Sequence, residues 1–141
     1  MSKVDEMVDV LRRWQGLERQ AMNDTAEIME QTRSPLVRMV MEIIRHDSLM
    51  HHRVQQFLLD SVTREAVAVT REDIGEIWEK LEAHDKMEKK TIELAEELKK
   101  NSWDPVHTTL LDYLLRDEKK HDTILEQLNG MKADLTKSSG A

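Results

Sequence analysis

The sequence predicts an all-α protein of four helices arranged as two antiparallel hairpins. Three observations support this prediction. The chain of 141 residues has only two prolines and four glycines, and 35% of its residues are charged. Apolar residues recur at intervals of three and four, which is the spacing of an amphipathic helix. The same hairpin pattern occurs twice, so the two halves should have equivalent structures.

The repeat is clearest in the second helix of each hairpin. Four residue types recur there 70 positions apart: Pro35, Asp47, His51 and Leu58, then Pro105, Asp117, His121 and Leu128. The preceding segments match at an offset of 64, which pairs Trp14 with Trp78 and Glu18 with Glu82. Because the matched residues include acids and histidines, the duplication concerns chemistry as well as architecture.

The first hairpin is predicted to contain two long helices. The first covers about residues 3–32. The second begins at Pro35, since proline is favoured in the first turn of a helix, and Ser34 is its cap. Only two or three residues around Arg33 separate these helices, so they should be antiparallel neighbours.

The second hairpin is predicted to follow the same plan. Its first helix covers about residues 72–100, with Asp73 or Thr70 as the cap. Its second helix begins at Pro105 and is capped by Asp104. The loop between them, around residues 101–103, is slightly longer than the corresponding loop of the first hairpin.

The connection between the hairpins is longer than a simple bundle needs. The eleven residues Ser61–Arg71 could span roughly 36 Å when extended. A helix of about 25 residues has nearly the same length, roughly 38 Å. We therefore expect a crossover along the bundle that makes the second and third helices parallel; a loose loop or a short extra helix is the alternative.

The last helix is predicted to end at Gly130, because glycine is a common terminator. The prediction is a single domain over residues 1–132, followed by a disordered tail over residues 133–141.

Composition excludes several classes of function. The formal net charge is −7 and the basic residues form no one-sided stripe, which argues against a nucleic-acid partner. No apolar stretch of about 18 residues occurs, so no membrane partner is expected. The acidic N-terminus has no signal core, which favours a cytoplasmic location. The absence of cysteine excludes disulfides, thiolate metal sites and a cysteine nucleophile.

Acids and histidines interrupt the apolar stripe of every predicted helix. Glu18 precedes Pro35, the start of the next helix, by almost the same number of residues as His51 follows it. The two side chains should therefore meet at one depth. In the second half His121 follows its proline at the same distance along the chain, but Glu82 precedes that proline by a longer stretch. The longer loop there would have to absorb about six residues.

Several buried carboxylates at one depth need a cation, a shared proton or water. A pair of divalent metal ions would supply the charge, and oxygen with imidazole ligands suits iron or manganese. Glu118 and His121 are three residues apart and therefore lie on one helix face. The sequence thus favours a metal site between the helices.

With these residues in place, the chain resembles the ferritin-like superfamily, in particular rubrerythrin-type di-iron proteins. The resemblance covers about residues 5–130 and rests on the duplicated hairpin, the long linker and the placement of acids and histidines. It implies that Glu18 and Glu82 are the single carboxylates of the first and third helices.

The resemblance also implies that Glu118 and His121 form the Glu-x-x-His motif of the fourth helix, and that His51 is the histidine of the second. Ser48 stands where the family has the first glutamate of that motif, and Asp47 is the neighbouring substitute. Six metal ligands are therefore expected in the bundle centre, with Asp117 as a further candidate: Glu18, Asp47, His51, Glu82, Glu118 and His121.

The function implied by this resemblance is a non-haem site for two iron or manganese ions that reacts with dioxygen or peroxide. An oxidoreductase of this kind would need an external electron donor, because the chain has no cysteine for a rubredoxin-type module. The alternative is a metal-free ferritin-like bundle that acts as an interaction or stress-associated protein. In that case Asp47 and His51, and likewise Asp117 and His121, would only pair with each other.

Two further predictions concern the surface. A homodimer is expected, because six apolar residues extend beyond the core stripes: Val4, Val8, Val10, Met22, Tyr113 and Leu115. Four histidines lie off the apolar stripes and are expected to be exposed rather than ligands: His46, His52, His84 and His107.

Overall fold

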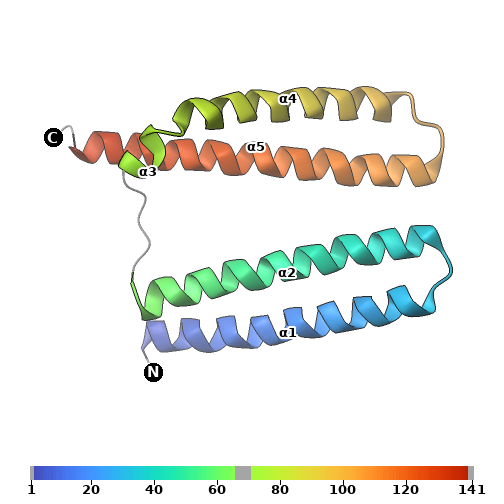
Figure 1. Cartoon of the computed structure of the whole chain (residues 1–141), viewed down its shortest axis with the longest axis horizontal. Helices are drawn as coiled ribbons and strands as arrows, with labels where there is room; N and C mark the ends of the chain where they lie inside the picture. The colour runs from blue at the N-terminus through green and yellow to red at the C-terminus, as the bar shows by residue number, and fades with distance from the viewer. Residues whose placement is uncertain (1, 66–70, 140–141) are drawn as a thin grey trace. The chain divides into compact units, whose positions relative to one another are not determined.

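The computed structural model of the chain describes residues 2–65 and 71–139 (Figure 1). Every regular element in these ranges is helical, and they contain no strand, which confirms the all-α prediction. The elements are α1 (Lys3–Gln31), α2 (Pro35–Thr63), α3 (Arg71–Gly75), α4 (Trp78–Lys100) and α5 (Pro105–Ser139). The chain divides into two compact units, Met1–Val67 and Ala68–Ala141. None of the helices in the described ranges is long and apolar enough to cross a membrane.

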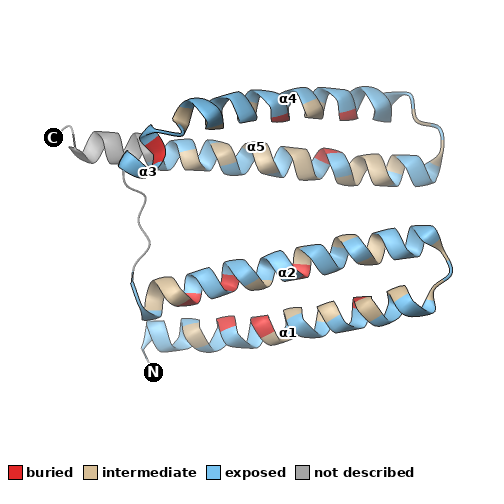
Figure 2. Ribbon diagram, viewed as in Figure 1, coloured by how far each residue is buried: buried red, intermediate tan, exposed pale blue. Residues whose placement is uncertain are grey.

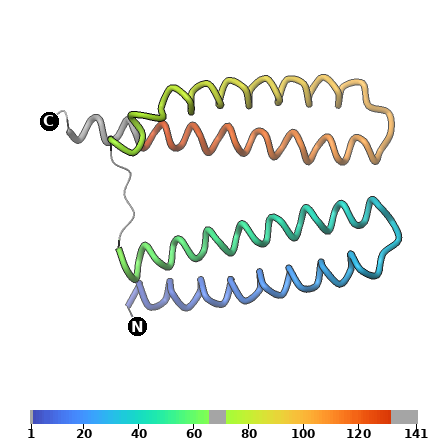
Figure 3. Tube along the Cα trace, viewed as in Figure 1, coloured from blue at the N-terminus to red at the C-terminus, as the bar shows by residue number. Residues whose placement is uncertain are grey.

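The first unit is an antiparallel hairpin of α1 and α2 (Figure 3). Ser2 caps α1 in a capping box, in which Asp5 donates its backbone N–H to the Ser2 hydroxyl. Ser34 caps α2 as predicted, because it accepts the backbone N–H of Val37 at 3.2 Å. The predicted start of the second helix at Pro35 is confirmed.

The interior of the first hairpin is narrow and partly polar (Figure 2). Its buried residues combine two leucines with four uncharged polar side chains: Leu11, Leu59, Gln15, Thr25, Ser48 and Gln55. Trp14 and Ile28 of α1 remain 50% and 41% exposed. Two helices can cover only the strip along which they touch, so the rest of each apolar face stays open.

The second unit is an antiparallel hairpin of α4 and α5, with α3 packed on α5. Asp104 caps α5 as predicted, since its Oδ1 accepts the backbone N–H of Val106 at 2.8 Å. The buried residues include Ile74, Ala95 and Leu115. Leu115 was predicted as surplus apolar surface for a dimer, and that assignment was wrong because the hairpin itself buries this side chain.

The helix predicted over residues 72–100 is interrupted. Helix α3 ends at Gly75, and the backbone N–H of Ile77 bonds to the carbonyl of Ile74 at 3.1 Å in a tight turn before α4 begins. Glycine weakens a helix because it has the greatest backbone freedom to lose. The interruption leaves Ile74 only 3% exposed.

The linker between the hairpins begins later than predicted. Helix α2 continues through Ser61 to Thr63, and its last turn closes with a bond from the Arg64 N–H to the Asp60 carbonyl. Residues 66–70 lie outside the described ranges, so the crossover and the parallel second and third helices stay predictions.

The end of the second hairpin also differs from the prediction. Helix α5 continues through Gly130 to Ser139, so the predicted helix end at Gly130 was wrong. No described residue, glycine included, has a positive φ, which is the conformation that favours glycine at a helix end. The predicted tail over residues 133–141 has no described side chains and stays a prediction.

Candidate metal centre

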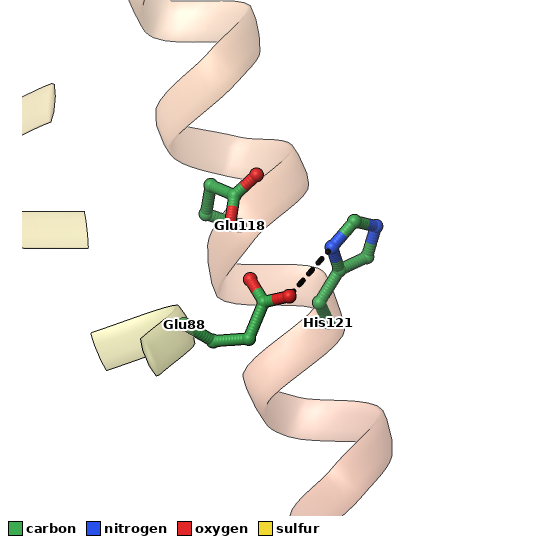
Figure 4. A group of neighbouring side chains, drawn as sticks. All are labelled: Glu88, Glu118 and His121. Atoms are coloured by element: carbon green, nitrogen blue, oxygen red, sulfur yellow. Dashed lines mark ion pairs between the residues drawn. The ribbon is translucent and has the colours of Figure 1, made fainter. Parts of the chain in front are cut away.

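The α4–α5 hairpin brings Glu88, Glu118 and His121 together (Figure 4). One ligand atom of each residue lies within 4.8 Å of the others. Glu88 reaches across from α4, and its side chain is only 9% exposed. Its Oε1 lies 3.6 Å from Nδ1 of His121 on α5. This is the only group of three or more such residues found in the described part of the chain.

The position of each residue in its helix explains why they meet. Glu118 and His121 are separated by three residues and therefore lie on one face of α5. Pro105 opens α5. Glu88 lies before Pro105 by almost the same number of residues as His121 lies after it. Antiparallel helices joined by a short turn bring such positions to the same depth.

Each of the three side chains has a further polar partner. The hydroxyl of Thr91 donates to Oε2 of Glu118 at 2.7 Å. Oδ2 of Asp117 lies 3.7 Å from Nε2 of His121, on the far side of that ring from Glu88. His84 Nε2 lies 2.8 Å from Glu88 Oε1. Such outer contacts orient metal-binding side chains and set the tautomer of a histidine.

The two glutamates lie close enough to change each other's pKa. A hydrogen bond with Glu118, followed by burial and by the negative charge of Glu118, raises the pKa of Glu88 above its ordinary value. Hydrogen bonds from Glu88 and then from Thr91 lower the pKa of Glu118. Two carboxylates in contact cannot both ionise cheaply, so a proton on this pair favours Glu88 and the negative charge favours Glu118.

A second acid pair lies one turn away in the same hairpin. A hydrogen bond with Asp85, then burial and the charge of Asp85, raises the pKa of Asp122. Oδ1 of each aspartate is buried without a hydrogen-bond donor. The interior of this hairpin therefore concentrates negative charge.

The residues present fit a divalent metal ion. Oε2 of Glu88 is buried and has no hydrogen-bond donor when both glutamates are ionised. A cation would bind this atom and would take the place of a proton on the two glutamates. Two carboxylates and one imidazole are ligands that iron, manganese and zinc all accept.

The first hairpin carries a related but smaller arrangement. Oε1 of Glu18 lies 3.5 Å from Nδ1 of His51, as the depth count predicts. The same oxygen accepts a hydrogen bond from Trp14 Nε1 at 3.2 Å, while Oε2 is buried without a donor. Ser48, 6% exposed, occupies the position equivalent to Glu118. This hairpin thus offers one carboxylate and one imidazole.

Two of the predicted ligands lie outside these arrangements. Glu82 is exposed and accepts a hydrogen bond from Trp78 Nε1 at 2.6 Å, and it does not join Glu118 and His121. Asp47 is half-buried on α2, and the described contacts include no ion pair between it and His51. Asp117, the further candidate, lies behind His121 rather than beside the glutamates.

Glu88 is the residue that the sequence analysis missed. The helices α1 and α4 end four and five residues before their prolines, so the loops differ by one residue and not by six. An offset of 70 therefore applies to both helices of the repeat and pairs Glu18 with Glu88. The offset of 64 came from Trp14–Glu18 and Trp78–Glu82, which are hydrogen-bonded pairs within one helix turn and carry no information on depth.

Three of the four histidines that were expected to be exposed have polar partners. His52 Nε2 lies 3.1 Å from an Arg19 nitrogen, and His107 lies 3.8 Å from Asp104. His84 is 54% exposed, yet its ring reaches the buried Glu88.

Comparisons of this chain with protein-family models, with curated proteins and with solved structures found no match.

Proposed function

We propose that this chain is a metal-binding protein of ferritin-like, rubrerythrin type, whose principal ligands are Glu88, Glu118 and His121. The observation that carries the proposal is the convergence of these three side chains within 4.8 Å around a buried carboxylate. Glu88 takes the place that the resemblance gave to Glu82. With that change, the second half of the chain has the full set of one glutamate and one Glu-x-x-His motif.

The proposal includes a four-helix bundle in which Glu18 and His51 complete a site for two ions. Its support is the repeat, which gives both hairpins the same glutamate and histidine at the same depth. The open apolar faces also support it, because neither hairpin covers its own large side chains. The exposed members of these faces include Leu17, Val54, Leu94, Leu98, Leu114 and Ile124.

Iron or manganese is the proposed metal of the site, and the reaction would be with dioxygen or peroxide. A bound pair of such ions would supply the redox chemistry. The chain's own residues would hold the ions, with Thr91 and Asp117 orienting Glu118 and His121. Electrons would come from an external donor, as the chain contains no cysteine.

A metal-free bundle that acts through protein partners is the second candidate, and one observation favours it. The raised pKa of Glu88 favours a neutral carboxyl there, and the rings of His84 and His121 lie beside acids of the cluster, so these side chains have partners without a metal. Ser48 also favours the metal-free candidate, because a serine is a poor ligand and the first hairpin therefore binds metal less well.

The test is a metal titration of the full chain after removal of metals with a chelator. We expect Fe²⁺ and Mn²⁺ to bind at micromolar free metal or below, with one ion per chain held more tightly than the second. Calorimetry and elemental analysis measure the affinity and the stoichiometry. If the wild-type chain takes up neither iron, manganese nor zinc in this range, the metal-free candidate stands in its place.

A further inference from the structure

The side chain of His84 contacts Glu88, one of the proposed metal ligands, although it lies off the apolar stripe. Its Nε2 lies 2.8 Å from Oε1 of Glu88. Nδ1 of His121 approaches the same oxygen at 3.6 Å from the other helix. Two imidazole nitrogens, one from each helix, therefore lie near the same buried carboxylate.

The spacing of the four residues is favourable for a shared ligand set. His84 and Glu88 are four residues apart on α4, and Glu118 and His121 are three apart on α5. Residues three or four apart share a helix face, and two ligands at i and i+4 of one helix can bind the same ion. Each helix of this hairpin thus presents one histidine and one glutamate.

We infer that His84 is a further metal ligand and that the α4–α5 hairpin holds one divalent ion by itself, through His84, Glu88, Glu118 and His121. This inference rests on the proposed function and adds the coordinating role of His84 to it. The first hairpin has no such set, because Trp14 occupies the position equivalent to His84 and Ser48 the position equivalent to Glu118. An indole N–H can donate a hydrogen bond but cannot bind a metal ion.

The second imidazole changes which ion the site prefers. Carboxylates alone suit magnesium and manganese, whereas imidazole favours zinc, cobalt and iron. We therefore expect the chain to bind Zn²⁺ and Co²⁺ more tightly than Mn²⁺, and we expect this preference to depend on His84.

The experiment compares the wild-type full chain with His84→Gln and with His107→Gln as the matched control. His107 is also a histidine of this hairpin that is paired with an acid close to it in the sequence, but it lies beside Asp104 at the turn. Both side chains are more than half exposed, so neither change should unfold the protein. Circular dichroism verifies that the helical content is retained.

For His84→Gln we expect the Kd for Zn²⁺ to rise at least about tenfold, which even the loss of an outer contact to a metal ligand can cost. The Kd for Mn²⁺ should rise less, and His107→Gln should leave both values unchanged. In ¹⁵N-histidine-labelled protein, the imidazole nitrogen signals of His84 should shift when Zn²⁺ is added.

Two results would contradict the inference in different ways. If zinc binds to the wild type while the His84 nitrogen signals stay unchanged, His84 is only an ion-pair partner, even if His84→Gln binds zinc more weakly, and the proposed function survives. If the wild type binds neither iron, manganese nor zinc, the proposed function fails and this inference fails with it.

Discussion

The two hairpins have the same helical frame, but they bury different chemistry. Positions 70 apart pair Glu18 with Glu88 and His51 with His121, and both pairs form glutamate–histidine contacts across the hairpin. Around these contacts the side chains differ. The α4–α5 hairpin has Glu118 where the α1–α2 hairpin has Ser48.

The difference extends along the interior. Gln15 in α1 donates to the His52 carbonyl and to the Gln56 side chain, so its amide is satisfied by neutral groups. The residues 70 positions after Gln15 and His52 are Asp85 and Asp122, which form an acid pair. The α1–α2 hairpin therefore has an amide at a position where the α4–α5 hairpin has a carboxyl group that needs a proton or a cation.

This comparison predicts that metal affinity resides mainly in α4–α5, and paired histidine variants test it. His121→Ala should weaken Fe²⁺ or Zn²⁺ binding by roughly 100-fold or more, because the loss of a ligand exceeds the 10–100-fold cost of losing an outer contact. His51→Ala and Asp47→Ala should have much smaller effects on the tighter ion. Isothermal titration of the chelated proteins measures the three affinities.

An equal loss in the His51→Ala and His121→Ala proteins would show that the hairpins contribute equally. That outcome would remove the asymmetry between them.

The second prediction reverses the main difference between the hairpins. Ser48→Glu places a carboxylate at the position equivalent to Glu118, near Glu18 and His51. We expect the weaker ion to bind about tenfold more tightly, in line with the size of single contacts to metal ligands. Ser48→Ala is the control, and it should leave the weaker affinity unchanged.

Elemental analysis at low free metal gives the stoichiometry of each variant. If Ser48→Glu leaves the second ion as weak as in the wild type, the missing carboxylate is not what limits the first hairpin.

Most of the helical frame could be predicted from the sequence. The prolines at 35 and 105, with their caps Ser34 and Asp104, fixed two helix starts, because these residues act through local backbone contacts. The interruption at residues 76–77 was missed because the apolar pattern continues across it. Helix α3 ends at Gly75 and packs on α5, a contact between segments distant in the sequence that the pattern does not show.

The candidate site could be predicted only in part. Glu118 and His121 were identified because their spacing within one helix is a local feature. Glu88 was missed because its place depends on the register between two helices, and the Trp–Glu pairs suggested the wrong register. His84 was set aside because a single-helix pattern cannot show that an exposed ring reaches a buried acid of the same helix.

The third prediction concerns the metal-free protein and its pH dependence. Glu88 has a raised pKa, so its protonated form stabilises the folded state below the ordinary value of 4.5, and that contribution is lost as the pH rises through the raised value. Glu118 has a lowered pKa and acts in the opposite sense, with its contribution lost as the pH falls through the lowered value.

Replacing Glu88 by glutamine gives a side chain that is a neutral hydrogen-bond donor at every pH. The contribution of this residue to the stability of the folded state is then no longer lost at higher pH. We expect Glu88→Gln to be more stable than wild type at neutral pH without metal, by about 1 kcal/mol, the size of one hydrogen bond. The gain should disappear near pH 4. Urea unfolding at several pH values measures it, and Glu18→Gln is the matched variant in the first hairpin.

A chelated Glu88→Gln protein that is less stable than wild type at neutral pH would contradict the account in which Glu118 raises the pKa of Glu88. It would mean that the ion pairs of ionised Glu88 with His84 and His121 outweigh its repulsion from Glu118.

The smallest expected effect concerns the ends of the hairpins. Helix α2 ends at Thr63, whereas α5 continues past the equivalent position to Ser139 and contains Gly130. A Cβ added at Gly130 would meet nothing within 4 Å, and the residue has no positive φ. Alanine should therefore stabilise α5 by roughly 0.5 kcal/mol, the low end of the alanine–glycine difference within helices.

Gly16→Ala in α1 is the matched control, because that glycine also lies inside a helix. Amide hydrogen exchange around residues 126–131 measures the local effect. If α5 instead ended at Gly130 in a left-handed cap, alanine there would speed exchange while Gly16→Ala would still slow exchange in α1.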